Sequence, residues 1–249
     1  RQAWLIPMTY CIGIALDKGL VFCSDSRTNA GIDQVSTYSK MHVFGRDGER
    51  RFVLLSAGNL ATTQAVVHEL EHDIRQQADT SLLSVNSLAE AADYIGEVSV
   101  KRQARFREGG MSSFDPKVTF ILGGQLRGEP AGIFLIYPEG NHITTSRDHP
   151  FLQIGESKYG KPILDRVITA GTSIDDAAKC AIVSMDSTLR SNLSVGPPIE
   201  LRVYETDALT AGRYLKFGDD DAYLRSLARG WNQKLIEAFT TLPEIDWAR

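Results

Sequence analysis

Three residues near the start of the chain have types and a spacing that could support nucleophilic chemistry. Thr9 directly follows Met8, and Asp25 ends the second of two apolar runs that flank a tight turn. Lys40 follows further along. A threonine that became the first residue would carry a nucleophile and a base together, because its α-amine can accept the hydroxyl proton. The reference pKa of an α-amine, about 7.7–8.0, is close to neutral pH, where a general base is most useful.

Asp25, Lys40 and Gly58 could support such a nucleophile. A nearby cation disfavours a second positive charge, so Lys40, held by Asp25, would keep the amine neutral. Gly58 ends the strand predicted at residues 50–58, and its N–H could stabilise an oxyanion because a missing Cβ allows close approach. In the alternative interpretation, Thr9 only starts a strand, Asp25 belongs to a turn and Lys40 is a surface charge. The residue types alone leave both interpretations open.

The two apolar runs predict a β-hairpin around a turn at residues 17–19. Residue pairs that sum to 36 then lie opposite each other, so that Cys11 faces Asp25 and Thr9 faces Arg27. Because cross-strand partners share a face, this register puts Thr9 and Asp25 on the same face. Both faces are apolar along most of their length, so we expect the hairpin to be covered on both sides.

The remaining chain alternates pairs of strands with pairs of helices. We expect strands at 50–58, 117–126, 131–140, 150–155, 199–205 and 211–217, and helices at 59–77, 87–107, 159–168 and 173–190, with a last helix after the acidic triplet 219–221. This order lacks the strict βα alternation of a doubly wound sheet and favours an α+β fold, with antiparallel sheets and helices packed outside. We predict one domain over residues 8–249, with residues 1–7 as a tag or upstream extension and Met8 as the natural start.

Composition narrows the function classes. The chain has 249 residues, 43% of them hydrophobic, and a formal charge of −4, which is typical of a globular protein. This charge, without a basic block, argues against nucleic acid or an anionic membrane surface as a partner. No apolar run reaches the roughly 18–20 residues of a membrane helix. The three cysteines are widely spaced, and no signal peptide is evident, which indicates a reducing, cytoplasmic compartment.

A second chemical motif competes with the first. Residues 68–72 read His-Glu-Leu-Glu-His, a pattern that can place two zinc ligands and a general base on one helix face. The flanking Glu71 and Asp73 are charged, whereas zinc-binding helices of this type are buried. We therefore expect His68 and His72 to lie on the solvent side of an amphipathic helix, with a zinc hydrolase as the minor alternative.

Several tracts resemble a known family. Residues 8–44, MTYCIGIALDKGLVFCSDSRTNAGIDQVSTYSKMHVF, resemble the start of proteasome β-type subunits and, among them, the bacterial proteasome-related Anbu (ancestral β-subunit) family. The likeness continues through residues 56–66, 154–166 and 186–201. It implies an N-terminal nucleophile hydrolase with a four-layer αββα sandwich of two antiparallel sheets. By this resemblance Thr9 is the nucleophile, Asp25 the orienting acid, Lys40 the amine-tuning base and Gly58 the oxyanion donor.

Two positions depart from the proteasome pattern. Where those subunits have Gly-Ser-Gly near the site, this chain has Gly-Glu-Ser-Lys, so either Ser157 or Glu156 takes the serine position. Where they have an Asp and, three residues on, a Ser, this chain has Ser191 and Ser194. The second serine matches, but the acid is absent, and we therefore expect weak or very selective peptidase activity.

These observations together predict a threonine peptidase that works as a homo-oligomer on peptide or protein substrates. It needs no metal or cofactor, and further partner proteins remain unidentified. A catalytically silent assembly scaffold is the alternative. The predicted helix 87–107 carries more apolar positions than one inward stripe needs, including Tyr94, Ile95, Val98 and Val100. We expect a second copy to cover them in a ring or an open spiral, unless the final helix folds back over this surface.

Overall fold

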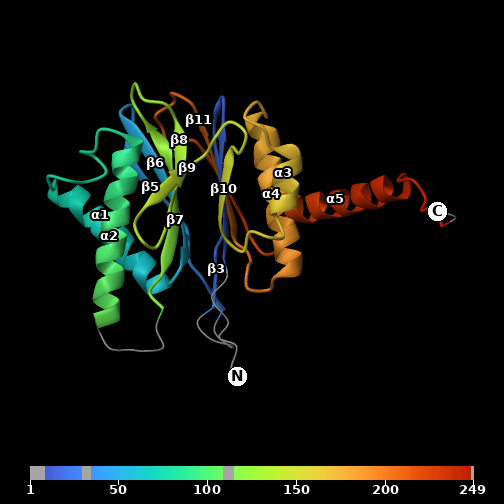
Figure 1. The fold of residues 1–249 in the computed structure, drawn as a ribbon, viewed down its shortest axis with the longest axis horizontal. Helices are drawn as coiled ribbons and strands as arrows, with labels where there is room; N and C mark the ends of the chain where they lie inside the picture. The colour runs from blue at the N-terminus through green and yellow to red at the C-terminus, as the bar shows by residue number, and fades with distance from the viewer. Residues whose placement is uncertain (1–8, 30–34, 109–114, 248–249) are drawn as a thin grey trace.

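The fold is an αββα sandwich, seen in a computed structural model that describes residues 9–29, 35–108 and 115–247. Two antiparallel five-stranded sheets lie face to face between two pairs of helices (Figure 1). The helices are α1 (Leu60–Gln76), α2 (Leu88–Glu108), α3 (Lys161–Val167), α4 (Ile174–Ser191) and α5 (Ala222–Thr240). Helices α1 and α2 cover one sheet, and α3 and α4 cover the other. The predicted fold class is confirmed.

Each sheet has its own strand order. The first runs β10-β1-β2-β11-β12, and the second runs β5-β6-β7-β8-β9. The strands of the first sheet are β1 (Tyr10–Leu16), β2 (Gly19–Asp25), β10 (Phe151–Gly155), β11 (Ile199–Glu205) and β12 (Arg213–Phe217). Those of the second are β5 (Met41–Arg46), β6 (Arg50–Gly58), β7 (Val118–Leu126), β8 (Gly132–Ile136) and β9 (His142–Thr144). A small pair, β3 (Arg27–Asn29) and β4 (Val35–Thr37), stands apart from both.

Three apolar layers hold the sandwich together. Phe22, Leu55 and Ile121 fill the space between the sheets, Leu70 and other side chains of α1 and α2 pack on the second sheet, and Ile182 of α4 packs on the first. Because β1 and β2 contribute to two of these layers, they are apolar on both faces, as predicted. Truncating a fully buried phenylalanine such as Phe22 to alanine typically costs about 3–5 kcal/mol.

The register of the first hairpin differs from the prediction. Leu16 pairs with Gly19, so paired residues sum to 35 and Cys11 lies opposite Ser24, not Asp25. Gly19 belongs to β2, and the turn contains only two residues, the length whose twist best suits a hairpin. A shift of one residue exchanges the faces of a strand. The expectation that Thr9 and Asp25 meet because they share a sheet face is therefore wrong, although the two side chains do meet.

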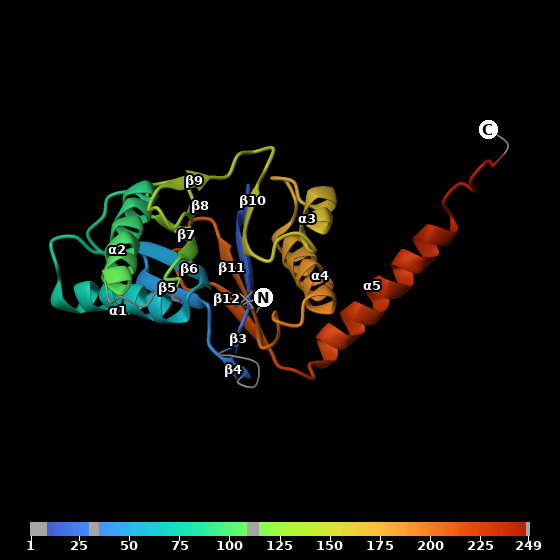
Figure 2. The ribbon, with the colours of Figure 1, turned by 60° about the horizontal axis from the view of Figure 1, so that its bottom comes forward.

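The expected self-association surface on α2 is also wrong. Tyr94, Ile95 and Val98 are buried within the chain, and Val100 is 40% exposed. The final helix does not cover α2 either, because α5 starts beside α4 on the opposite side and runs away from the body (Figure 2). Helix spacing shows that a side chain is buried, but not which neighbour buries it.

Helix α5 instead carries the exposed apolar surface. Asp221 caps its start by accepting hydrogen bonds from the backbone N–H groups of Tyr223 (2.8 Å) and Leu224 (3.1 Å). Only its first turns pack on the body, and no residue of the helix is buried. Further along, Phe239 is 73% exposed and Trp247, beyond the helix, is 88% exposed. Such a run of exposed large apolar side chains is typical of an interface.

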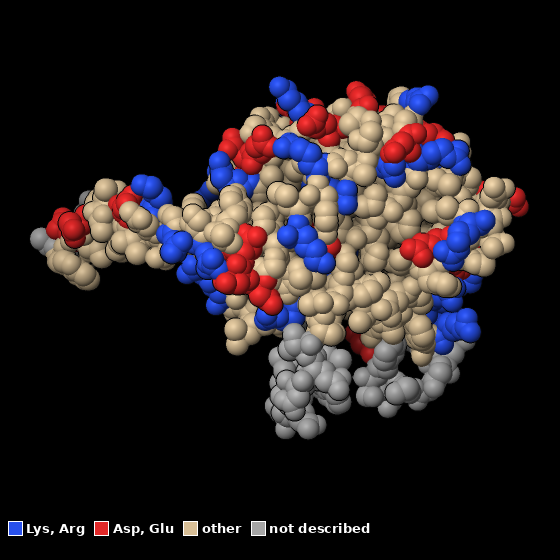
Figure 3. Space-filling view, turned by 180° about the vertical axis from the view of Figure 1, so that it is seen from behind, with Lys and Arg blue, Asp and Glu red and all other residues tan. Residues whose placement is uncertain are grey.

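The surface otherwise has mixed character. Acidic and basic side chains are interspersed over the face seen in Figure 3. Within the described residues, no helix combines the length and the hydropathy needed to cross a membrane. Cys11, Cys23 and Cys180 are buried and form no disulfide.

A buried carboxylate links the two helices of the first layer. Glu69 of α1 accepts hydrogen bonds from Lys101 Nζ (2.9 Å) and from Arg102 Nε, both on α2. Burial, the largest single cause, raises the pKa of Glu69, but the hydrogen bonds and positive charges of Lys101 and Arg102 together outweigh it and hold that pKa below its ordinary value of 4.5. A group whose folded-state pKa is lowered stabilises the fold above its unfolded pKa, and this contribution disappears as pH falls through the folded value.

We therefore expect Glu69→Gln to lower the free energy of unfolding at pH 7 by about 1–3 kcal/mol. The difference from wild type should shrink as pH falls below 4.5, the ordinary pKa of the group. Urea unfolding of both proteins at pH 7 and near pH 3 measures this. Glu71→Gln, at an exposed position of the same helix, is the control and should change little at either pH. A pH-independent loss in Glu69→Gln would contradict the ion-pair explanation.

Candidate active site

Asp25 is the centre of a buried polar cluster at the end of β2. Its Oδ1 accepts a short hydrogen bond from the Thr9 hydroxyl, one of 3.1 Å from the Tyr10 N–H and one of 2.6 Å from Lys40 Nζ. Its Oδ2 accepts a hydrogen bond of 3.2 Å from the Gly196 N–H. The carboxylate is fully buried, and each of its oxygens has a donor. The cluster therefore unites the residues predicted as nucleophile, orienting acid and base.

Strand pairing brings these segments to one end of the first sheet. Thr9 directly precedes β1, Asp25 ends β2, and Gly196 lies just before Ile199 of β11, which pairs with Asp25. The Thr9 carbonyl accepts a hydrogen bond of 2.7 Å from the Glu156 N–H, at the end of β10. Thr9 is thus held through its side chain and its carbonyl.

Gly155 makes the contact between β10 and Thr9 possible. Its φ is +81°, and a Cβ atom at this position would lie 1.9 Å from the Thr9 carbonyl oxygen. Any larger residue would push the Thr9 backbone away from β10 or strain its own backbone. A glycine here is therefore a requirement of the site as well as of the sheet.

Lys40 is the cation of the cluster. Its Nζ lies 2.6 Å from Asp25 Oδ1 and donates a second hydrogen bond of 2.8 Å to the Arg27 carbonyl. The residue is 6% exposed, so its charge is almost entirely withdrawn from water. A buried charge is costly unless it is paired and hydrogen-bonded, and removing one partner leaves the other uncompensated. Asp25 and Lys40 therefore depend on each other.

We expect Lys40→Ala to lower the free energy of unfolding by about 3–5 kcal/mol, because it leaves the Asp25 carboxylate buried without its cation. Asp25→Asn combined with Lys40→Ala should cost less than the sum of the two single changes. Urea unfolding of the four proteins completes this double-mutant cycle.

The exposed ion pair of Lys161 and Asp165, 2.7 Å apart, provides the matched control. Lys161→Ala should cost only about 0–1 kcal/mol. Simple additivity of the Asp25 and Lys40 changes would show that the two residues are not energetically coupled.

Gly58 ends β6, opposite Val118 of β7. Its φ is +122°, and a Cβ atom would lie 2.4 Å from the Lys117 carbonyl oxygen, so the close approach of β7 accounts for the glycine. Ser56, two positions earlier, donates from its N–H to the Lys40 carbonyl (3.1 Å), and its own carbonyl lies 3.6 Å from the Cys11 sulfur. The end of β6 thus reaches the cluster from the second sheet, while the role of Gly58 as an oxyanion donor stays a prediction.

The two departures from the proteasome pattern meet at Asn192. Its Nδ2 donates to Glu156 Oε2 (3.2 Å), and its Oδ1 accepts a hydrogen bond of 2.6 Å from the Ser194 hydroxyl. The Ser157 carbonyl instead accepts a hydrogen bond of 3.0 Å from the N–H of Lys161, the first residue of α3. The Ser194 hydroxyl is thus connected through Asn192 to the side chain of Glu156, whose backbone N–H binds the Thr9 carbonyl. Of the two alternatives, it is Glu156 whose side chain enters this network.

Two residues around the cluster could not be identified from local sequence patterns. Asn192 follows α4, and Gly196 contributes only its N–H, which residue type does not reveal. Cys11 lies close to the cluster, but burial, the largest cause, raises the pKa of its thiol well above the usual range. A thiol that stays protonated is a poor nucleophile, which favours the Thr9 hydroxyl.

The competing zinc motif is not assembled into a site. His68 and His72 are exposed, as predicted, and the Glu69 carboxylate is engaged by Lys101 and Arg102. The described residues contain no group of three histidine, cysteine or acidic side chains positioned to hold a metal ion. Glu69 therefore serves the contact between α1 and α2, and nothing in its surroundings suits it to be a general base.

The layers and the position of the cluster define the class of the protein. Two antiparallel sheets lie between helix pairs, and a threonine directly precedes strand β1 beside a buried Asp–Lys pair. This is the fold of the N-terminal nucleophile hydrolases, the superfamily that contains the proteasome β subunits.

Comparison with solved structures identifies the family within that class. The chain is 44% identical to Anbu (ancestral β-subunit) from Yersinia bercovieri, with 95% of this chain and 99% of that chain covered and a TM-score of 0.90. It is 45% identical to the Anbu complex from Pseudomonas aeruginosa, with 96% of this chain and 99% of that chain covered and a TM-score of 0.92. It is 44% identical to Anbu from Hyphomicrobium sp. strain MC1, with 95% of this chain and 99% of that chain covered and a TM-score of 0.87. The chain belongs to the Anbu family, which confirms the predicted resemblance. No family model and no curated protein sequence matches it.

Proposed function

We propose that this protein is a threonine peptidase whose nucleophile is Thr9, freed by removal of the residues before it. The observation that carries the proposal is the contact of the Thr9 hydroxyl with Asp25, which is itself paired with buried Lys40 at 2.6 Å. An N-terminal threonine in this position would have its hydroxyl oriented by a carboxylate oxygen that also binds a cation. We place this activity in the cytoplasm, because the three cysteines are buried and form no disulfide.

The reaction follows from these groups. The Thr9 α-amine accepts the hydroxyl proton as Oγ1 attacks the carbonyl carbon of the substrate, and the Gly58 N–H stabilises the oxyanion that forms. The amine then gives the proton to the leaving amine, and an ester on Thr9 remains. Water hydrolyses that ester and restores the hydroxyl. Lys40 keeps the α-amine neutral at working pH, because a second positive charge nearby is unfavourable.

Weak or selective turnover fits the surroundings of Thr9. The Ser194 hydroxyl donates to Asn192, and Asn192 in turn donates to Glu156. The side chains of Ser194, Asn192 and Glu156 therefore bind one another, and the contact with Thr9 is made by the Glu156 backbone N–H. With fewer polar side chains directed at the amine, less of the proton transfer is assisted.

We expect a chain that starts at Thr9 to hydrolyse a peptide library, and a chain that retains residues 1–8 to be inactive, because its Thr9 nitrogen is an amide and cannot act as a base. Thr9→Ala in the shortened chain should lower turnover by about a thousandfold or more. Peptide cleavage followed by mass spectrometry measures both effects.

Thr9→Ser, which keeps the hydroxyl and the amine, is the matched control and should retain activity. Equal turnover by the long and the shortened chains would refute the role of the amine. A shortened chain that folds but neither cleaves peptides nor is acylated at Thr9 would instead support the catalytically silent scaffold.

We further propose that the protein works as a homo-oligomer that associates through α5. The solved Pseudomonas aeruginosa relative is described as a helical assembly of the Anbu complex. In this chain, the second half of α5 and the residues after it expose apolar side chains that the body leaves uncovered: Leu235, Ile236, Phe239, Leu242, Ile245 and Trp247. Covering them with a second copy would remove this surface from water.

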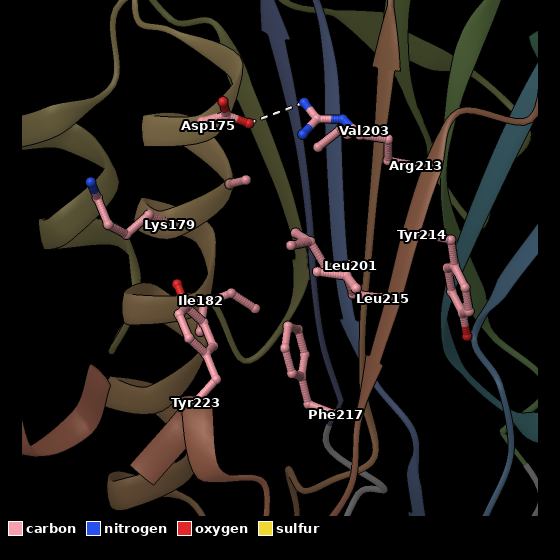
Figure 4. A pocket seen from close by; sticks show the side chains of 11 residues that line it. Asp175, Lys179, Ile182, Leu201, Val203, Arg213, Tyr214, Leu215, Phe217 and Tyr223 are labelled. Atoms are coloured by element: carbon pink, nitrogen blue, oxygen red, sulfur yellow. Dashed lines mark hydrogen bonds and ion pairs between the residues drawn. The ribbon is translucent and has the colours of Figure 1, made fainter. Parts of the chain in front are cut away.

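An apolar groove near the start of α5 could bind the α5 of a second copy. It lies between α4 and β12, has a volume of about 470 Å³ and is lined by Ile182, Leu201, Leu215, Phe217 and Tyr223 (Figure 4). Because α5 leaves the body at this groove, its own distal half points away, whereas the α5 of a second copy is free to fill it. The rim is polar, and its two cations are paired within the chain, Lys179 with Asp176 (2.8 Å) and Arg213 with Asp175 (3.0 Å).

We expect Phe239→Asp combined with Leu242→Asp to shift the protein from oligomer to monomer, because two charges would be introduced into an apolar contact. Light scattering over a range of protein concentrations measures this. Ile143→Asp, at an exposed position of β9 far from α5, is the matched control and should leave the assembly intact. A wild-type chain that is monomeric at micromolar concentration would contradict the homo-oligomer.

A further inference from the structure

A second buried carboxylate lies beside the Asp25 cluster. Glu200 of β11 is 3% exposed. Its Oε2 accepts hydrogen bonds from the Ser26 hydroxyl (3.2 Å) and the Ser39 hydroxyl (2.7 Å), and its Oε1 accepts one from the Tyr214 hydroxyl (2.6 Å). All three donors are neutral hydroxyl groups. In the described part of the chain, no lysine or arginine is within ion-pair distance of this carboxylate.

The position of Glu200 is unfavourable for stability alone. Burying a carboxylate is costly even when it is hydrogen-bonded, and apolar residues of similar volume often replace buried ionic groups without loss. The residues that Glu200 binds therefore indicate what its role could be.

The two serine donors flank the residues of the Asp–Lys pair. Ser26 directly follows Asp25, and Ser39 directly precedes Lys40. Since one oxygen of Glu200 accepts from both serines, it ties the segment that carries the acid to the segment that carries the cation. We propose that Glu200 is a positioning residue for the Asp25–Lys40 pair, an inference that rests on the function proposed for that pair.

Neighbouring hydrogen bonds show why this tie matters. The Ser39 oxygen also accepts a hydrogen bond of 3.3 Å from the N–H of Met41, the first residue of β5, so Glu200 holds the serine that lies just before this strand. The Tyr38 N–H donates to the Ser26 carbonyl at 2.9 Å. Lys40 lies between Ser39 and Met41, and the direction of its long side chain therefore depends on a segment that Glu200 anchors.

Tyr214 connects Glu200 to the edge of the sheet. It belongs to β12, which is an edge strand of the first sheet, and is 41% exposed. Burial, followed by the hydrogen bond to Glu200, raises the pKa of Tyr214 to about 12, so its hydroxyl remains a donor at neutral pH. The Arg202 guanidinium, 4.7 Å from the ring centre, packs on the same ring. A side chain at the surface is thus two hydrogen bonds from the serines beside the pair.

The test compares two substitutions of similar size in the chain that starts at Thr9. Glu200→Leu removes the acceptor, and Glu200→Gln keeps an acceptor oxygen but removes the charge. The readout is the rate at which an activated ester acylates Thr9, measured over pH by mass spectrometry. We expect Glu200→Leu to slow acylation by about tenfold to a hundredfold. Its pH midpoint should rise, because a displaced Lys40 no longer lowers the pKa of the amine.

Glu200→Gln should retain most of the rate and the wild-type midpoint. Glu205→Leu, at an exposed position at the end of the same strand, is the matched control and should change neither. Wild-type behaviour of Glu200→Leu would overturn the positioning role, because Glu200 would then have no role in acylation. Equal losses in Glu200→Leu and Glu200→Gln would also overturn it, because the effect would then come from the charge of Glu200.

A crystal structure of Glu200→Leu provides a measurement that does not depend on catalysis. We expect the distance between Lys40 Nζ and Asp25 Oδ1, 2.6 Å in the wild type, to exceed ion-pair range, and an unchanged distance would overturn the proposal. If Glu200→Leu does not fold, the same two measurements on Tyr214→Phe, which removes one hydroxyl from a half-exposed side chain, decide the question in the same way. A protein that is never acylated contradicts the peptidase proposal, while the crystal structure still decides the role of Glu200.

Discussion

The buried pairing of Lys40 with Asp25 is the constraint around which the site is organised. Neither charge is stable away from water without the other, so the segments that carry them must arrive together. The same carboxylate also binds the Thr9 hydroxyl and the N–H groups of Tyr10 and Gly196. Formation of the first sheet and formation of the site are therefore one structural event, because the groups that neutralise and saturate Asp25 come from sequence-distant parts of the chain.

The sandwich supplies the rigidity that this arrangement needs. Thr9 directly precedes β1 and Asp25 ends the neighbouring strand β2, and apolar layers cover both faces of these strands. The second sheet reaches the cluster at Ser56, which is hydrogen-bonded to the Lys40 backbone. Residues far from Thr9 in sequence, such as Asn192 and Glu200, then complete the polar surroundings without contacting Thr9 directly. A small displacement of one sheet against the other would therefore change the geometry of the Asp25 cluster, because close-packed interiors transmit strain.

The sequence predicts the layers well and their contacts less well. Continuous apolar strands identify two covered sheets, because only a strand buried on both faces has such a pattern. The hairpin register depends on where the turn begins, and assigning Gly19 to the turn and not to β2 shifts every pair by one. Apolar spacing in α2 indicates burial but not that α1 and the sheet provide it. Thr9, Asp25 and Lys40 are recognisable from family likeness, whereas Asn192 and Glu200 act through long-range contacts that no local pattern encodes.

The groups that fix the position of Thr9 are different from the atom that would act as its base. Its carbonyl is fixed by the Glu156 N–H, against a glycine that leaves no room for movement, and its hydroxyl is fixed by Asp25. Neither contact uses the Thr9 nitrogen. Under the proposed function, cutting the peptide bond before Thr9 would leave both contacts in place and change the nitrogen of Thr9 from an amide to an amine. The uncut chain would then already be a template of the active protein, and activation would require one hydrolysis and no later folding step.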